Sequence, residues 1–248
     1  MTHEHRNRIL KSLRLYGLLD HWDQTLELAR KKRFSHARLL AHVLENEHRI
    51  RTDNARQYRL KRARIPEMLC METYPFDRQP KLNRKGLLSI YDAFDYMPNC
   101  QNIVWLGRTG CGKTGLATAF LIDAINRGCT GRFITFNDLI GDLRTSCADY
   151  SESKLLRRFA AYDCLLIDEL GYVEVIEPAQ VGLFFNLMHK RHRRKPTLIT
   201  SNLGFDDWRG FLKNDHLTAA LIDRLTENSH VINMKNCRSL RRKLPPTP

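Results

Sequence analysis

Eight residues, GRTGCGKT at 107–114, combine three glycines with a lysine and a threonine directly after the apolar run NIVWL. Glycine loses more backbone entropy on folding than any other residue, so this run favours neither a strand nor a helix interior. The spacing is that of a phosphate-binding loop (P-loop), in which glycines between a strand and a helix let backbone N–H groups face a phosphate chain. The residues expected to bind ATP here are Gly107, Arg108, Thr109, Gly110, Cys111, Gly112, Lys113 and Thr114.

The lysine and threonine of this loop have the chemistry that a triphosphate with Mg²⁺ requires. Lys113 is expected to reach the β- and γ-phosphates as a point charge, and the hydroxyl of Thr114 is expected to bind Mg²⁺. A second motif, CLLIDEL at 164–170, ends an apolar strand in two carboxylates. Asp168 is expected to hold the Mg²⁺ opposite Thr114, because burying an unpaired carboxylate is costly. Glu169 is expected to activate the attacking water as a general base, which favours an ATP hydrolase over a small-molecule kinase.

A further polar group follows the apolar strand at 196–202, which ends in Ser201 and Asn202. Ligands of open α/β sheets lie beyond the carboxyl ends of the strands, so Asn202 could reach the γ-phosphate or the attacking water. A simple turn explains the same two residues equally well. The residues alone leave both interpretations open.

The elements that must position these groups alternate between strands and helices from about residue 99 onward. Strands are predicted over 102–107, 132–137, 164–170, 196–202 and 230–234, and helices over 114–127, 138–146, 152–162 and 178–194. Apolar strands that alternate with helices are typical of a parallel sheet covered on both faces. The predicted fold class is therefore α/β, with the ATPase domain over 99–243.

The part of the chain before this domain is helical and basic. Residues 1–64 hold 16 basic and 7 acidic residues, and their apolar spacing predicts a small helical domain with a long helix after Ser35 and a break near Gly17. Residues 65–98 contain four prolines, which predicts a linker with short helical pieces. The last five residues, 244–248, are predicted to form a disordered tail.

The charge distribution points to a polyanionic partner. The net charge is +14, yet residues 99–237 hold 17 basic and 15 acidic residues, so the excess is concentrated toward the ends. A concentrated basic excess indicates nucleic acid, while a solvated basic surface is the alternative. The residues expected to contact DNA in the N-terminal domain are Arg49, Arg56, Arg59, Lys61, Arg62 and Arg64.

Composition excludes several other classes of protein. No apolar run approaches the roughly 20 residues of a membrane span, so no membrane partner is expected. Seven cysteines without a CxxC pair fit a reducing cytoplasm better than a disulfide framework. One of them, Cys111, lies in the phosphate loop, where bound ATP is expected to shield it from alkylation, and an inert buried thiol is the alternative.

The motifs belong to a longer series of segments: NIVWLGRTGCGKTGLATAF, CLLIDELGYVE, PTLITSNLGFDDW, and ALIDRL followed by SHVINMK. In order and spacing this series resembles the IstB-type ATPases, the helper proteins of bacterial insertion sequences and relatives of the DnaC helicase loaders. The N-terminal segment LKSLRLYGLLDHWDQ is also similar to the opening of that family. The resemblance therefore covers about residues 9–243.

The resemblance implies an AAA+ αβα sandwich, in which the strand that carries Asn202 lies between the P-loop strand and the Asp-Glu strand. It implies that Asn202 is the first sensor and that Arg224, in LIDRL, is an arginine finger that enters a neighbouring subunit's site. On the residues alone, Arg224 would instead pair with an acid such as Glu227. Arg241 partly matches a nucleotide-sensing run of the family, although the residues at 236–238 depart from it.

The implied partners are DNA, bound with little sequence preference, a cognate transposase, and further copies of the chain. In the loader relatives a helix after the second strand faces DNA, and Lys154, Arg157 and Arg158 occupy that region here. The resemblance thus implies a DNA-binding ATPase that multimerises on DNA and assists transposition in the bacterial cytoplasm. A replicative helicase loader and a non-catalytic DNA-binding scaffold are the alternatives; the acidic and P-loop residues argue against the scaffold.

Overall fold

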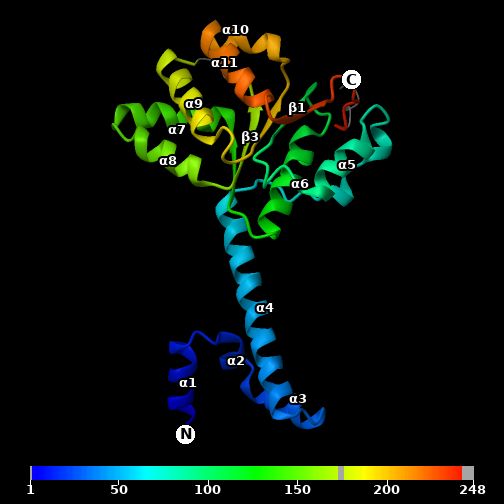
Figure 1. The fold of residues 1–248 in the computed structure, drawn as a ribbon, viewed down its shortest axis with the longest axis vertical. Coiled ribbons are helices and arrows are strands. Elements are labelled where there is room, and N and C mark those ends of the chain that lie inside the picture. The colour runs from blue at the N-terminus through cyan, green and yellow to red at the C-terminus, as the bar shows by residue number, and fades with distance from the viewer. Residues whose placement is uncertain (1, 173–175, 242–248) are drawn as a thin grey trace, which may run out of the picture. The chain divides into compact units, whose positions relative to one another are not determined.

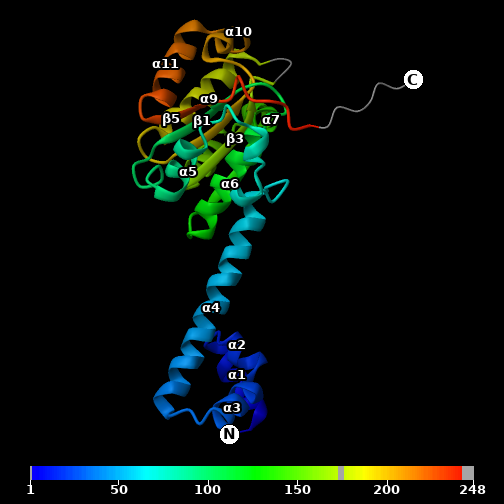
Figure 2. The ribbon, with the colours of Figure 1, turned by 90° about the vertical axis from the view of Figure 1, so that its right-hand side faces the viewer.

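The computed structural model describes residues 2–172 and 176–241, which divide into two compact units. The first unit extends to Tyr58 and contains α1 (His3–Ser12), α2 (Tyr16–Asp20), α3 (Trp22–Lys31) and the first part of α4 (His36–Ala63) (Figure 2). The division falls inside α4 rather than at its end, so the basic residues 59–64 group with the second unit. The tail predicted over 244–248 lies outside the described residues.

Two local features of the first unit can be compared with the sequence. Ser35 precedes α4 as predicted, and its hydroxyl accepts a hydrogen bond from the N–H of Arg38 at 3.3 Å. The predicted break near Gly17 lies at residues 13–15, between α1 and α2, and the glycine itself is within α2. A Cβ at Gly17 would lie 2.3 Å from Cδ1 of Ile50, so the glycine lets α2 approach α4 closely.

The second unit is built on five parallel strands in the order β2-β3-β4-β1-β5. The strands are β1 (Asn102–Leu106), β2 (Gly131–Thr135), β3 (Cys164–Leu170), β4 (Thr197–Ser201) and β5 (Ser229–Asn233). The helices are α5 (Arg84–Ala93), α6 (Lys113–Asn126), α7 (Phe136–Ala148), α8 (Glu152–Ala161), α9 (Pro178–Arg191), α10 (Trp208–Leu212) and α11 (Asp215–Thr226). The strand with the sensor position, β4, lies between β1 and β3, as the resemblance implied.

Helices cover both faces of this sheet. Along β1, Val104 packs into the apolar layer that includes α7, α8, α9 and α11, whereas Ile103 and Trp105 pack into the layer that includes α6 (Figure 1). Because side chains of a strand alternate between the two faces, burial on both faces explains the uninterrupted apolar runs of the sequence. Among the described helices none is long and apolar enough to cross a membrane.

Several predicted boundaries differ from the structure by one to three residues, and the segment predicted as a linker is folded. The second strand ends at Thr135 instead of 137, because the hydroxyl of Thr135 accepts a hydrogen bond from the N–H of Asp138 at 3.1 Å and caps α7. Residues 65–98 contain α5 and the 3-10 turns η1 (Met71–Thr73) and η2 (Phe76–Arg78). Met71, Leu87 and Tyr96 are buried in the layer that includes α6, so this segment is part of the ATPase unit rather than a linker.

Candidate nucleotide site

The glycine-rich loop has the backbone that its sequence predicts. It joins β1 to the first turn of α6, and Gly110 and Gly112 adopt φ values of +83° and +92°. These left-handed conformations favour glycine. A Cβ at Gly112 would also lie 2.7 Å from a ring carbon of Tyr74, so a larger residue at this position meets both strain and collision.

Three residues far away in the sequence donate hydrogen bonds to carbonyl groups of this loop. The hydroxyl of Tyr74 and the amide of Gln79 donate hydrogen bonds to the carbonyl of Cys111, at 3.0 and 3.2 Å. The backbone N–H of Leu240 donates to the carbonyl of Gly110 at 2.8 Å. No local motif points to Tyr74 and Gln79, because they lie in the proline-containing segment predicted to be a linker.

Lys113 begins α6 with its ammonium turned back into the loop. Its Nζ donates to the carbonyls of Gly107 at 2.7 Å and Arg108 at 3.0 Å, and the side chain is buried. Burial lowers the pKa of Lys113, and none of the described carboxylates lies within ion-pair distance of it. A buried cation without an anionic partner fits the binding of a phosphate chain.

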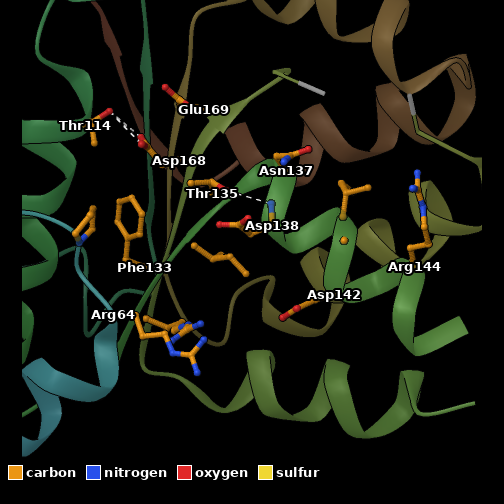
Figure 3. Close-up of a pocket in the computed structure, with 15 residues that line it drawn as sticks. Arg64, Thr114, Phe133, Thr135, Asn137, Asp138, Asp142, Arg144, Asp168 and Glu169 are labelled. Carbon is orange, nitrogen blue, oxygen red and sulfur yellow. Dashed lines mark hydrogen bonds between the residues drawn. The ribbon is translucent and has the colours of Figure 1, made fainter. Parts of the chain in front are cut away.

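Thr114 and Asp168 bring the two sequence motifs into contact. The hydroxyl of Thr114 donates to Oδ1 and Oδ2 of Asp168 at 2.9 and 3.2 Å, as Figure 3 shows. Burial raises the pKa of Asp168, and hydrogen bonds from Thr200 and Thr114 oppose that rise. Neighbouring ligands of an octahedral Mg²⁺ lie about 3 Å apart, so these two oxygens fit the donor set of that ion.

A bulge at the end of β3 gives the two adjacent acidic residues different environments: Asp168 is buried and Glu169 is exposed. The pairing register between β3 and β4 shifts between Ile167 and Leu170, and Glu169 has a left-handed φ of +57°. The hydroxyl of Thr200 accepts the N–H of Glu169 at 2.9 Å and donates to Oδ1 of Asp168 at 2.5 Å. Thr200 therefore fixes the buried carboxylate and the backbone that exposes Glu169. Thr200 was not among the predicted site residues, because a threonine within an apolar strand carries no signal of its own.

Replacing Thr200 by valine tests this positioning role. Thr200→Val keeps the shape of the side chain but removes both hydrogen bonds, so we expect kcat for ATP hydrolysis to fall about tenfold, as for the loss of one or two such bonds. ATP affinity, measured with a fluorescent analogue, should change little. Thr200→Ser should restore most of kcat. A kcat for Thr200→Val equal to that of the unaltered chain would show that the bulge needs no such support.

The loop and the strand ends enclose a cavity of about 400 Å³. It is lined by Thr109, Gly110, Gly112, Lys113, Thr114, Glu169, Tyr172, Thr200, Asn202 and Arg241. Its volume lies within the usual range of small-molecule sites, about 300–1,000 Å³. The structure therefore brings the exposed side chains of Glu169, Asn202 and Arg241 to the same cavity as the phosphate-binding loop.

Comparison with known proteins agrees with this geometry. A family model described as "IstB-like ATP binding protein" matches residues 8–245. The chain belongs to the IstB-like ATP binding protein family. A relative named for ATP binding in insertion sequence IS21 of Pseudomonas aeruginosa is 31% identical over 92% of this chain and 85% of its own length. A second relative, from insertion sequence IS5376 of Geobacillus stearothermophilus, is 29% identical over 94% of this chain and 90% of its own length.

Solved structures show that this IstB-like chain shares the AAA+ P-loop fold. DnaI matches with a TM-score of 0.53 and 20% identity, covering 60% of this chain and 84% of its own. The DnaC helicase loader matches with a TM-score of 0.51 and 23% identity, covering 61% and 89%. The fold implied by the sequence resemblance is therefore confirmed.

Arg224 is not among the residues that line the nucleotide cavity of this chain. Its guanidinium donates to the carbonyl of Ala220 at 3.0 Å and lies 4.5 Å from the ring centroid of Phe185. The alternative ion pair with Glu227 does not form, because that carboxylate pairs with Arg193 and with His192. The charge of Arg224 therefore has no acidic partner within the part of the IstB-like chain that the structure describes.

Cys111 contributes backbone to the nucleotide site but does not expose its thiol. The side chain is fully buried, and Lys113 Nζ lies 3.9 Å from the sulfur. This burial supports the inert thiol over the reactive one, so alkylation of Cys111 is expected to be slow with or without ATP.

The basic residues predicted to bind DNA lie in both units of this IstB-like chain. Arg49 and Arg56 belong to the first unit, and Arg59, Lys61, Arg62, Arg64, Lys154, Arg157 and Arg158 to the second. On α8, Lys154, Arg157 and Arg158 are exposed while Leu155 and Phe159 face the core. The structure thus gives α8 one basic and one apolar face.

Proposed function

We propose that this chain binds and hydrolyses ATP with Mg²⁺, assembles with further copies on DNA, and assists a cognate transposase in insertion-sequence transposition. The observation that carries the proposal is the contact between Thr114 and Asp168, which joins the phosphate loop to the acidic strand end beside Lys113. Neither motif alone requires hydrolysis. Together with Glu169 in the same cavity they supply cation, metal ligands and base.

Each residue of the site would have a separate task. Lys113 would bind the β- and γ-phosphates, and Asn202 would hydrogen-bond to the γ-phosphate or to the attacking water. Glu169 would accept the proton of that water. Thr114 and Asp168 would hold Mg²⁺, which when bound offsets the negative charge of the phosphates. Arg241 would add a positive charge at the edge of the cavity.

The names of the relatives support a transposase as partner, and the positive net charge supports DNA. The two relatives described above carry the names of insertion sequences, whereas DnaI and the DnaC helicase loader share the fold alone. A net charge of +14 favours a polyanionic partner. Assembly would let Arg224 serve the nucleotide site of a neighbouring copy.

The test is the ATPase rate per subunit as a function of protein concentration, with and without duplex DNA. We expect this rate to rise with concentration, and to rise at lower concentration when DNA is present, because assembly completes the site. A Lys113→Ala variant controls for contaminating ATPases. A rate per subunit that changes with neither protein concentration nor DNA would argue against assembly. A rate equal to that of Lys113→Ala would argue against hydrolysis itself.

A further inference from the structure

A second cavity, of about 880 Å³, lies beside the nucleotide cavity. The two cavities share Thr114 and Glu169, and Asp168 also lines the larger one. Figure 3 shows Thr114, Asp168 and Glu169 at one end and Arg64 at another. The basic residues of its lining are Arg64, Arg132 and Arg144, none of which has a task in ATP hydrolysis.

Arg132 is the least accessible of these arginines. It lies on β2, the edge strand of the sheet, and only 9% of its surface is exposed. Among the described residues its guanidinium donates one hydrogen bond, to the carbonyl of Arg62, and that bond is long, at 3.5 Å. A guanidinium carries five N–H groups, so most of them are left for the cavity that Arg132 lines.

The charges around Arg132 leave it without a counter-ion. The carboxylate of Asp142, which also lines the cavity, pairs with Arg158 at 3.2 Å, and no ion pair to Arg132 is formed in the described part of the chain. Burial lowers the pKa of Arg132, and the nearby charges of Arg64 and Arg158 lower it further, while Tyr162 and Asp142 raise it. Of the other acids of the lining, Asp168 and Glu169 lie at the nucleotide end, and Asp138 lies between that end and Arg64 (Figure 3).

A purely structural role explains only part of this arrangement. A cation at the carboxyl end of a helix is stabilised by the helix dipole, and Arg132 does face the end of α4 through Arg62. A bond of 3.5 Å satisfies little of a buried guanidinium, and Arg64 places a second positive charge close by. Two arginines that share a cavity, neither of them in an ion pair within the described residues, fit an anion.

We infer that Arg64 and Arg132 form a binding site for a phosphodiester group of the DNA backbone, at the basic end of this second cavity. The planar guanidinium matches the geometry of phosphate oxygens. A polyanion is favoured over a free phosphate because Arg158, which pairs with Asp142 of the cavity lining, shares the exposed face of α8 with Lys154 and Arg157. The inference rests on the proposed DNA binding and extends it to Arg132, which the sequence did not single out.

The test is the affinity for a fluorescein-labelled duplex of arbitrary sequence, measured by anisotropy over a series of KCl concentrations with Mg²⁺ and a non-hydrolysable ATP analogue. Arg132→Gln and Arg64→Gln should each weaken binding about tenfold at low salt, since a charge-assisted bond is lost. Each should also reduce the slope of log K against log salt by about one, as expected for one phosphate contact. Arg132→Lys should retain most of the slope. The matched control is Arg209→Gln. Arg209 is an exposed arginine of α10 that lines neither cavity.

The variants separate the inference from the proposal on which it rests. If the unaltered chain does not bind the duplex, the proposed DNA binding fails and the inference fails with it. If the unaltered chain binds but Arg132→Gln and Arg64→Gln behave like Arg209→Gln, only the phosphate site is disproved. Arg64 is exposed, so its substitution tests the site even if Arg132→Gln does not fold.

Discussion

Glu169→Gln is expected to leave ATP binding intact and to lower the rate of hydrolysis by about 10²–10⁴-fold, the usual contribution of a general base. Glutamine keeps the length of the side chain and the hydrogen bond from the backbone N–H of residue 169 to Thr200, but it cannot accept a proton from water. Glu169 is exposed and lines both cavities, so the substitution leaves the core unchanged. Single-turnover hydrolysis and equilibrium binding of a fluorescent ATP analogue would separate the two effects.

A matched control is Glu67→Gln, which removes an exposed carboxylate that lines neither cavity. It should hydrolyse ATP at the rate of the unaltered chain. If Glu169→Gln also retained that rate, another group would have to activate the water. If Glu169→Gln lost ATP binding instead, the carboxylate would have a structural role in the site.

The parts of this site that the sequence predicts are those encoded by adjacent residues. The phosphate loop depends on glycines at fixed spacing between an apolar strand and a helix, and the acidic pair directly follows a buried strand. The residues of each motif also predict the strand or helix that carries it. In a parallel sheet both motifs then lie at the same edge, where Thr114 and Asp168 can come into contact. The place of the Asn202 strand between the other two came from the family resemblance, because periodicity alone does not specify which strands are neighbours.

The parts that the sequence does not predict depend on contacts between distant segments. Gln79 accepts the N–H of Arg238 across 159 residues and also donates to the phosphate loop, yet it is an isolated polar residue in a proline-containing segment. Thr200 is one of several small polar residues at a strand end, and only the bulge in β3 reveals its role. Arg132 reads as an ordinary residue of an edge strand. Tertiary packing, which no local pattern encodes, gives these side chains their partners.

Strand and helix ends were harder to predict for a local reason. Phe136 continues the apolar run of β2, which predicts a strand, although it is the first residue of α7. A buried aromatic residue suits either element. In the folded chain the hydroxyl of Thr135 caps α7, so the strand ends there and Phe136 begins the helix.

Arg224→Ala is expected to reduce DNA-stimulated hydrolysis by about 10³–10⁵-fold, the range for an arginine that stabilises transition-state charge. ATP binding should stay near normal, because Arg224 does not line the nucleotide cavity of its own chain. The guanidinium packs on Phe185 and one carbonyl of its own helix, so removing it leaves no buried charge unpaired. Steady-state ATPase rates with saturating duplex DNA would measure the loss.

Mixing two inactive variants distinguishes a finger that acts between subunits from one that acts within a chain. Arg224→Ala keeps Glu169, and Glu169→Gln keeps Arg224, so a mixed assembly contains interfaces in which one subunit supplies the base and its neighbour the arginine. With random mixing at equal amounts, about one quarter of head-to-tail interfaces have that combination, so the rate should recover to about one quarter of that of the unaltered chain. A mixture as inactive as its components would show that Arg224 does not act in a neighbouring site. Recovery could not arise within a single chain, because each chain then lacks one of the two groups.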